Sequence, residues 1–382
     1  DASQIAAIEA AARGDDCLIT GGAGTGKTTI IAEIQARLGE RAAILAPTGK
    51  AAARLKEATG YFAQTIHSYL MYDGDTFHGP DRIRDPIICD ESSMIDSWLM
   101  SHIIRRHPPQ VILVGDSAQL PPVGKGQPFH DLLRLRKDIV HTLTTCHRAS
   151  ASVHRAANLV RSGNIPPLSE RADGETWAMI ETGNGEKTQA QILKWVAAGH
   201  FDPRQDIILS PRHGDEDSDG DIRALNKGVM EIVNPHNLGE KWKVGDRVIN
   251  CKNWSKIDLW NGDTGTVTAV DADGNPWVTL DRRRELGDVL IEGTDMLNEL
   301  VHAWCLSVHK AQGSQFRRVI FVCLAKHSHM TDRSLVYTAI TRAREGCVVC
   351  GQLSAFCAAV QTQHTKRTVL QELMKEKESI AC

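Results

Sequence analysis

Short apolar runs alternate with helix-like stretches through the first half of the chain. The runs expected to be strands are residues 16–20, 42–46, 86–90 and 111–116. Helical patterns are expected at residues 1–13, 29–34 and 50–58. This alternation is typical of an α/β domain in which helices cover both faces of a parallel sheet. Polar or acidic residues recur where the strands end, and such sheets bind ligands at that edge.

The second half of the chain repeats the alternation of apolar runs and helix-like stretches. A β-rich segment interrupts this alternation. Residues 206–210 are expected to form a strand, and residues 222–233 a helix. After Gly239 come short β-rich runs separated by Gly, Asp and Asn, at residues 244–250, 262–268 and 277–280. Their spacing predicts a small antiparallel barrel of about 60 residues. The α/β pattern resumes at residues 304–308 and 318–322, so the barrel is an insertion.

A shorter insertion interrupts the first α/β domain. Residues 71–85 mix turn residues with aromatics, which favours a small hairpin, with a plain surface loop as the alternative. The expected first domain comprises residues 1–70 and 86–140, and the second comprises residues 141–238 and 299–382 around an insertion at 239–298.

Composition places the chain among soluble globular proteins. With 382 residues, 42% of them hydrophobic and 24% charged, it is long enough for two or three domains. The sequence has no apolar run of membrane-spanning length and no signal-peptide pattern at its start, so we expect no membrane partner. Ten cysteines without disulfide spacing suit reduced thiols in a cytoplasmic protein. Cys347 and Cys350 match C-x-x-C within an apolar run, which favours a strand over a metal or redox site.

The net charge of the chain argues against nucleic-acid binding through an overall positive surface. The formal charge is −3, so bulk electrostatics do not support nucleic-acid binding. Any such binding would have to use a local groove.

The strongest chemical motif lies at Gly21–Thr28, which fits G-x-x-x-x-G-K-[ST] between an expected strand and an expected helix. The glycines let backbone N–H groups point at phosphate oxygens, and the helix N-terminus favours negative charge. Lys27 can reach the β- and γ-phosphates, and the Thr28 hydroxyl can bind Mg²⁺. The alternative is an ordinary glycine-rich turn. The predicted nucleotide contacts in the loop are Gly22, Ala23, Gly24, Thr25, Gly26, Lys27, Thr28 and Thr29.

Polar residues downstream can supply the remaining chemistry of phosphoryl transfer. Asp90 can hold Mg²⁺ and Glu91 can orient or deprotonate water, the alternative being helix capping by acidic residues. Gln119 follows another strand and can sense the γ-phosphate, the alternative being a polar loop residue. Arg148 and Arg342, the latter expected late on a helix, can stabilise developing charge, although surface arginines are common.

In order along the chain, these segments resemble the motifs of superfamily 1 helicases, in particular the 5′→3′ branch of RecD-like and Dda-like proteins. The matching segments are residues 21–28 (motif I), 46–52 (Ia), 65–68 (Ib), 90–94 (II), 115–123 (III), 308–314 (V) and 336–343 (VI), with Arg148 at the arginine of motif IV. The match runs from Gln4 to about residue 345. It departs from the family at His147 and Ala149, where relatives more often have Phe and Gln, and the insertion at 71–85 is short.

This resemblance implies two RecA-like P-loop domains, with residues 71–85 as a 1B pin and 239–298 as an SH3-like 2B domain. It also implies that Gln4 reads adenine and that Gly313 contacts the nucleotide. The implied contacts to single-stranded DNA are Pro47, Thr48, His67, Pro122, Val308 and His309. The catalytic set is Lys27, Glu91, Gln119, Arg148 and Arg342, and the metal ligands are Thr28 and Asp90.

The implied function is an ATP- and Mg²⁺-dependent DNA helicase that moves 5′→3′ on single-stranded DNA and acts at single-strand/duplex junctions. Its implied settings are DNA repair, recombination and replication, with single-strand-binding or recombination proteins as candidate partners. Two alternatives stay open: a motor subunit of a larger recombination or conjugation complex, and an RNA-directed superfamily 1 helicase. Motifs III, V and VI argue against a P-loop NTPase that does not translocate.

Overall fold

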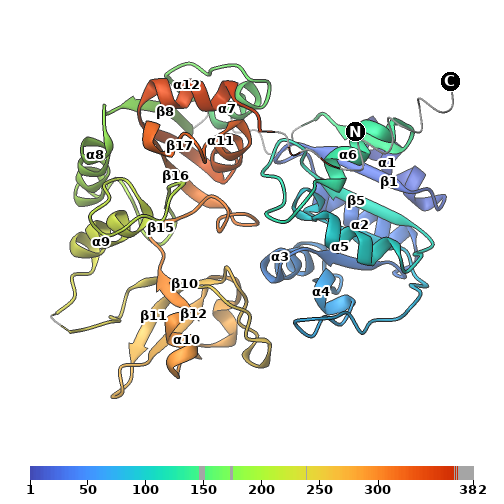
Figure 1. Cartoon of the computed structure of the whole chain (residues 1–382), viewed down its shortest axis with the longest axis horizontal. Helices are drawn as coiled ribbons and strands as arrows, with labels where there is room; N and C mark the ends of the chain where they lie inside the picture. Colours follow the sequence, from blue (N-terminus) through green and yellow to red (C-terminus); the bar gives the residue numbers. More distant parts are fainter. Residues whose placement is uncertain (146–150, 173–174, 238, 365, 367, 369–382) are drawn as a thin grey trace. The chain divides into compact units, whose positions relative to one another are not determined.

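The protein was analysed as a computed structural model, which describes residues 1–145, 151–172, 175–237, 239–364, 366 and 368. Contacts divide the chain into two compact units, Asp1–Ala149 with His364–Cys382, and Ser150–Gln363 (Figure 1). Each unit contains its own sheet, parallel throughout in the first unit and parallel except for one edge strand in the second, as the alternation of apolar runs predicts in the main. Among the described residues, no helix has the length and apolar character needed to cross a membrane.

The first unit is built on a six-stranded parallel sheet. Its strands are β1 (Cys17–Gly21), β2 (Ala43–Ala46), β3 (Ala63–Thr65), β4 (Ile87–Cys89), β5 (Val111–Gly115) and β6 (Val140–Leu143), in the order β3-β2-β4-β5-β1-β6. Its helices are α1 (Ala2–Ala12), α2 (Lys27–Arg37), α3 (Gly49–Thr59), α4 (Ile66–Tyr69), α5 (Ser97–Ile104) and α6 (Pro128–Leu135). Since β6 pairs with β1, this sheet continues past residue 140.

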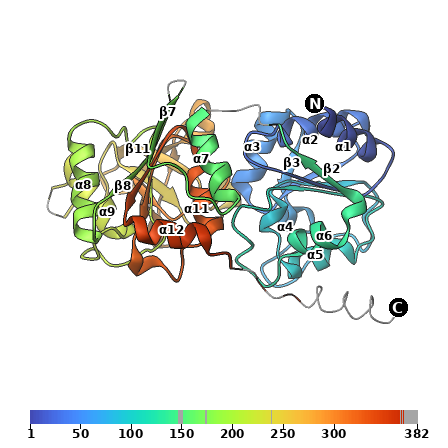
Figure 2. The same cartoon turned by 90° about the horizontal axis from the view of Figure 1, so that it is seen from above.

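Buried residues of each strand alternate between two hydrophobic cores. Ile19 packs in the core that contains residues of α1, α2 and α3, whereas its neighbour Leu18 packs in the core with residues of α4 and α5. Figure 2 shows α1–α3 and α4–α6 on opposite faces of the sheet. Both faces are therefore covered, as we expect for strands that are apolar along their whole length.

The second unit has a six-stranded sheet of its own. Its strands are β7 (Ser169–Ala172), β8 (Glu175–Glu181), β9 (Ile207–Leu209), β15 (Cys305–Leu306), β16 (Phe316–Cys323) and β17 (Ala343–Gly351), in the order β15-β9-β16-β17-β8-β7. Its helices are α7 (Ala151–Arg161), α8 (Gly185–Ala197), α9 (Ile222–Val233), α11 (Arg333–Ile340) and α12 (Leu353–Gln361). The edge strand β7 is antiparallel to β8, while the other pairs are parallel. Cys347 and Cys350 lie buried in β17, which confirms the strand interpretation of the C-x-x-C motif.

A five-stranded antiparallel sheet separates α9 from β15, which confirms the antiparallel β-rich segment expected there. It contains β10 (Arg247–Asn250), β11 (Thr264–Val270), β12 (Pro276–Leu280), β13 (Val289–Leu290) and β14 (Leu300–His302), in the order β13-β12-β11-β10-β14, with the short helix α10 (Thr294–Asn298) before β14. Trp242, Val248 and Leu280 belong to its own small hydrophobic core.

The segment 71–85 folds around a tight turn. An antiparallel bridge joins Tyr72 to Phe77, and Asp73 Oδ1 accepts the backbone N–H groups of Asp75 (2.9 Å) and Thr76 (2.8 Å). The Phe77 ring lies 5.0 Å from the ring of Trp98 on α5, measured between centroids. Aromatic packing therefore attaches this insertion to the first unit.

Candidate nucleotide-binding site

The phosphate loop joins β1 to α2 in a conformation that requires glycine. Gly24 (φ 79°) and Gly26 (φ 82°) are left-handed, which side chains with a Cβ adopt only at a cost. Gly21 is constrained by space instead, because a Cβ there would lie 2.6 Å from Thr25 Oγ1 and 2.9 Å from Leu143 Cβ. The motif residues thus adopt the strand–loop–helix geometry on which the sequence interpretation depends.

Side chains of the loop are held by its own backbone. The Lys27 ammonium donates to the carbonyl oxygens of Gly21 and Gly22, both at 2.9 Å, and Thr25 Oγ1 donates to the Gly22 carbonyl at 2.9 Å. Gln4 Nε2 donates to the Thr25 carbonyl at 3.1 Å, which ties the predicted adenine-reading residue to the loop. The Lys27 charge therefore lies within the loop at the N-terminus of α2, where backbone dipoles also favour an anion.

Asp90 and Glu91 reach the same edge of the sheet through its strand order. They follow β4, which is separated from β1 by β5 alone, and parallel strands end at one edge. Burial and the neighbouring charge of Glu91 together raise the pKa of Asp90 to about 6, although the charges of Lys27 and Arg54 act in the opposite direction. Asp90 is therefore mainly ionised at neutral pH and can serve as a Mg²⁺ ligand. Topology brings it close enough to Lys27 for their charges to interact.

The backbone at Glu91 has an unusual conformation. Its φ of 50° is left-handed, a region that costs a residue other than glycine about 1–3 kcal/mol. The strained residue lies between β4 and a short 3₁₀ turn at Ser92–Met94. Strain of this kind concentrates at functional sites, which agrees with the catalytic role predicted for this carboxylate.

Gln119 is held at the adjoining strand end. Its side chain is buried, and its Nε2 donates to Asp116 Oδ2 at 3.4 Å. Asp116 Oδ1 in turn accepts the Ala118 N–H at 3.1 Å. The amide is therefore oriented at the end of β5, which lies between the strands that carry the phosphate loop and Asp90.

The residues predicted to bind DNA in the first unit also follow strand ends. Pro47 and Thr48 come after β2, and Thr48 Oγ1 accepts the Ala51 N–H at 3.2 Å as the N-cap of α3. His67 lies on α4, directly after the neighbouring strand β3. Pro122 is buried, and its carbonyl accepts the ammonium of Lys366.

The second unit holds the remaining predicted residues that the structure describes. Arg342 lies two residues beyond the end of α11, not on the helix as the sequence suggested, because α11 ends at Ile340. It is 4% exposed, and its guanidinium donates to Thr338 O (3.2 Å), Ser314 O (3.3 Å) and Thr341 Oγ1 (3.3 Å). Arg148 lies outside the described residues.

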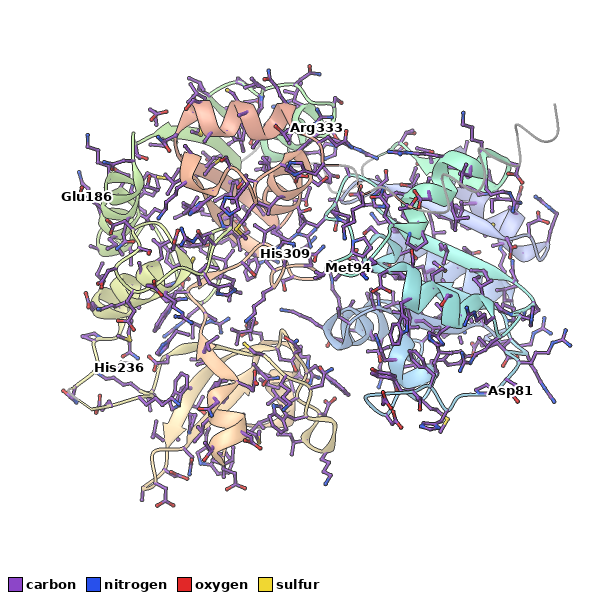
Figure 3. The ribbon with its side chains drawn as sticks, viewed as in Figure 1. Asp81, Met94, Glu186, His236, His309 and Arg333 are labelled. Carbon is purple, nitrogen blue, oxygen red and sulfur yellow. The ribbon has the colours of Figure 1, made fainter. Side chains whose placement is uncertain are left out.

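The loop between β15 and β16 carries three further predicted site residues, Val308, His309 and Gly313. His309, labelled in Figure 3, is exposed, whereas the Val308 side chain is fully buried. Gly313 has a left-handed φ of 71°. Val308 as a whole is 0% exposed, so it offers a ligand no accessible surface in this conformation.

Arg54 was not predicted from the sequence. It lies on α3, and its positive charge lowers the pKa of Asp90. No local pattern distinguishes it from an ordinary helical arginine, since its role depends on how α3 packs against β2 and β3.

Sequence comparisons match two segments of the chain to family models. Residues 1–177 match the AAA domain family, and residues 302–350 match the UvrD-like helicase C-terminal domain. The ATP-dependent RecD2 DNA helicase of Deinococcus radiodurans is 32% identical over 380 residues, which cover 94% of this chain and 50% of that protein. The RecBCD enzyme subunit RecD of Mycolicibacterium smegmatis is 30% identical over 408 residues, covering 94% of this chain and 72% of the relative. The chain thus spans half the length of the RecD2 relative.

Solved structures agree at the level of fold. The Pif1 helicase from Candida albicans superposes with a TM-score of 0.58 at 19% identity, covering 99% of each chain. A structure described as two coordinating Pif1 helicases at forked duplex DNA has a TM-score of 0.55 at 22% identity, covering 99% of this chain and 97% of that one.

The fold and the phosphate loop define a P-loop NTPase of the helicase type. More narrowly, the chain belongs to the RecD-like family of superfamily 1B helicases.

Proposed function

We propose that this chain is an ATP-dependent DNA helicase that translocates 5′→3′ on single-stranded DNA and unwinds duplexes from single-strand/duplex junctions. The observation that carries the proposal is the convergence of Lys27, Asp90–Glu91 and Gln119 on one edge of the first sheet. The RecD2 relative is described as an ATP-dependent DNA helicase, which supports the same activity here.

Each predicted site residue has a defined chemical task in this proposal. Backbone N–H groups of residues 22–29 and the Lys27 ammonium hold the phosphates. Thr28 and Asp90 hold Mg²⁺, which neutralises charge on the β- and γ-phosphates when it is bound. Glu91 orients and deprotonates the attacking water, and Gln119 responds to the γ-phosphate. Arg148 and Arg342 stabilise the charge that develops during transfer.

DNA would be bound by sequence-independent contacts. Thr48 would position a phosphate through its hydroxyl, which carries no base information, whereas Pro47, Pro122 and Val308 belong to the segments expected to line the path of the strand. The rings of His67 and His309 would offer surfaces for stacking, worth about 1–3 kcal/mol per base. Such local contacts fit a protein whose formal net charge is −3.

The proposed domain organisation assigns a role to each insertion. Residues 1–70 and 86–140, extended to Leu143 because β6 pairs with β1, form domain 1A, and the residues that follow β6 up to 238 form domain 2A together with residues 299–363. Residues 71–85 form the 1B pin, and residues 239–298 form the SH3-like 2B domain. The Tyr72–Phe77 bridge and the antiparallel ladder of β10–β14 support these last two assignments.

A second candidate is a motor subunit of a larger recombination complex. The M. smegmatis relative is named as a subunit of the RecBCD enzyme, and the 71–85 turn is short for a strand-splitting element. On this alternative the isolated chain hydrolyses ATP on single-stranded DNA but unwinds poorly without recombination or single-strand-binding partners.

Duplexes with a 5′ or a 3′ single-stranded tail test the proposal directly. We expect ATP-dependent unwinding of the 5′-tailed substrate only, and Lys27→Ala should lower DNA-stimulated ATP hydrolysis at least about 10²-fold. RNA with the same sequence should stimulate hydrolysis less than DNA. Preference for the 3′ tail would refute the polarity, and stronger stimulation by RNA would favour an RNA-directed helicase.

A further inference from the structure

Both chain connections to the antiparallel sheet of the second unit pass through one cluster of polar side chains. His236 lies on the segment that leads from α9 toward this sheet, where Figure 3 labels it. Asp246 immediately precedes β10, and His302 ends β14, the last strand before the chain returns to β15. The cluster therefore joins the outgoing and the returning segments.

The three side chains have the spacing of metal ligands. His236 Nε2 lies 2.9 Å from Asp246 Oδ1, and His302 Nε2 lies 3.3 Å from Asp246 Oδ2. One ligand atom from each residue lies within 4.8 Å of the other two. Zinc bonds of about 2.0–2.2 Å in a tetrahedral site place ligand atoms about 3.4 Å apart. Small shifts of these side chains would suffice to coordinate an ion.

Other groups hold the carboxylate in place. The Asp246 side chain is fully buried. Asn234 Nδ2 donates to its Oδ1 at 2.8 Å, and the Lys243 N–H donates to its Oδ2 at 2.9 Å. Burial alone would raise its pKa, but the hydrogen bonds from His302, His236 and these two donors together hold it below the usual value. The group is therefore an anion at neutral pH, as a ligand must be.

The histidine rings are oriented as well. His236 Nδ1 lies 3.4 Å from the Glu240 carbonyl, an acceptor that favours a proton on Nδ1. Nε2 lies 2.9 Å from Asp246 Oδ1, so loss of the Nε2 proton that this carboxylate accepts would free Nε2 to bind a cation in its place. The His302 ring stacks on Trp304, with centroids 5.2 Å apart and planes at 12°.

Space for a further ligand adjoins the cluster. His236 and His302 both line a cavity of about 690 Å³, together with Trp242. The Trp242 indole N–H is buried and has no hydrogen-bond partner among the described residues. Three protein ligands with room for a water molecule is a common arrangement for zinc.

We propose that His236, Asp246 and His302 form a binding site for a borderline divalent cation of the zinc class, which clamps the antiparallel sheet to the α/β sheet of the second unit. Two imidazoles and a carboxylate favour zinc-like ions over Mg²⁺, which prefers oxygen. The site is separate from the nucleotide chemistry, and it does not depend on the proposed helicase activity.

Zinc titration of the whole metal-free chain tests the site. We expect one equivalent of Zn²⁺ to bind in isothermal calorimetry, and Co²⁺ to give a visible spectrum of nitrogen and oxygen coordination. His236→Gln and His302→Gln should each weaken binding at least about 10²-fold. His200→Gln, which changes an exposed histidine before β9, is the matched control and should bind as the unchanged chain does.

Thermal unfolding provides a second readout. Zn²⁺ should raise the melting temperature of the unchanged chain and of His200→Gln, but not that of His302→Gln, since binding to the folded state alone stabilises it. His302 is partly exposed, so its variant should fold even if His236→Gln does not. Absence of Zn²⁺ binding, or equal binding in both ligand variants and the control, would overturn the proposal.

Discussion

At the scale of single residues, Glu91 combines a strained backbone with a carboxylate at the edge of the nucleotide site. Its φ of 50° lies in the left-handed region, which residues other than glycine adopt at a cost. Its charge also raises the pKa of Asp90. A catalytic role for Glu91 would explain both the strained backbone and the effect of its charge on the Asp90 pKa.

Glu91→Gln and Glu91→Gly separate these two properties. Both should retain ATP binding and lose at least about 10²-fold in DNA-stimulated hydrolysis, because both remove the base. Only Glu91→Gly should preserve or raise the free energy of unfolding, by up to about 1 kcal/mol, since glycine adopts a positive φ readily. Steady-state ATPase and urea unfolding measure the two effects. A less stable Glu91→Gly than Glu91→Gln would show that the backbone is not strained.

The raised pKa of Asp90 predicts how Mg²⁺ binding depends on pH. As pH falls through about 6, Asp90 gains a proton and its attraction for Mg²⁺ is lost. The affinity for Mg²⁺·nucleotide should then decrease by up to about tenfold per pH unit. A fluorescent nucleotide titrated at constant Mg²⁺ measures this decrease.

Glu91→Gln is the control for that experiment. It removes one charge that raises the Asp90 pKa, so the midpoint should move to lower pH, whereas protonation of the nucleotide itself is unchanged. An unchanged midpoint in this variant would mean that another group controls the pH dependence.

At the scale of elements, the turn at 71–85 is held by aromatic packing more than by strand pairing. The Phe77 ring lies 4.7 Å from Tyr72, 5.0 Å from Trp98 and 4.4 Å from His102, between centroids. One bridge joins the two arms, at Tyr72 and Phe77. An isolated two-stranded turn is marginal in water, so its position depends on these contacts.

Phe77→Ala should therefore impair any role of the turn in strand separation. We expect unwinding of a 5′-tailed duplex to fall several-fold while single-stranded-DNA-stimulated ATPase stays within about twofold, because the nucleotide site is untouched. Phe62→Ala, which removes a 68% exposed ring outside the insertion, is the matched control. Equal unwinding by both variants would count against the pin assignment.

At the scale of the whole molecule, the predicted catalytic residues come from both compact units. The first supplies the phosphate loop, Asp90, Glu91 and Gln119, and the second supplies Arg342. Hydrolysis can move one unit against the other only if a residue of the second responds to the nucleotide. Arg342 is the described residue that this mechanism requires.

Arg342→Lys and Arg342→Ala test that requirement. Turnover should fall at least about 10²-fold in both, with nucleotide affinity changed only a few-fold, because the arginine acts on charge that develops during transfer. Since its guanidinium is buried, melting temperatures must show that each variant folds. Single-turnover hydrolysis separates the rate from binding, and a large loss of affinity with normal turnover would refute the role.

Much of the site could be predicted from the sequence because its parts are local. The loop at Gly21–Thr28, its strand and its helix are contiguous, so their conformations follow from neighbouring residues. Most of the parallel strands were recognisable from apolar runs, and β17 from the run around Cys347, whereas the parallel strands β3 and β8 were not predicted. The antiparallel edge strand β7 was not predicted, because its pairing with β8 decides it. The end of α11 before Arg342 was not predicted either, because the packing around the helix decides where it ends.

Tertiary structure alone decided which distant residues act together. Strand order places β4 beside β5 and thereby brings Asp90 near Lys27, and burial there gives Asp90 its raised pKa. The same holds for His236, Asp246 and His302, which no sequence spacing connects. Sequence by itself determined the phosphate-binding chemistry, because that chemistry depends on one continuous turn. The electrostatics of Asp90 and the histidine–aspartate cluster required the fold, because charge interaction and burial depend on distance in space.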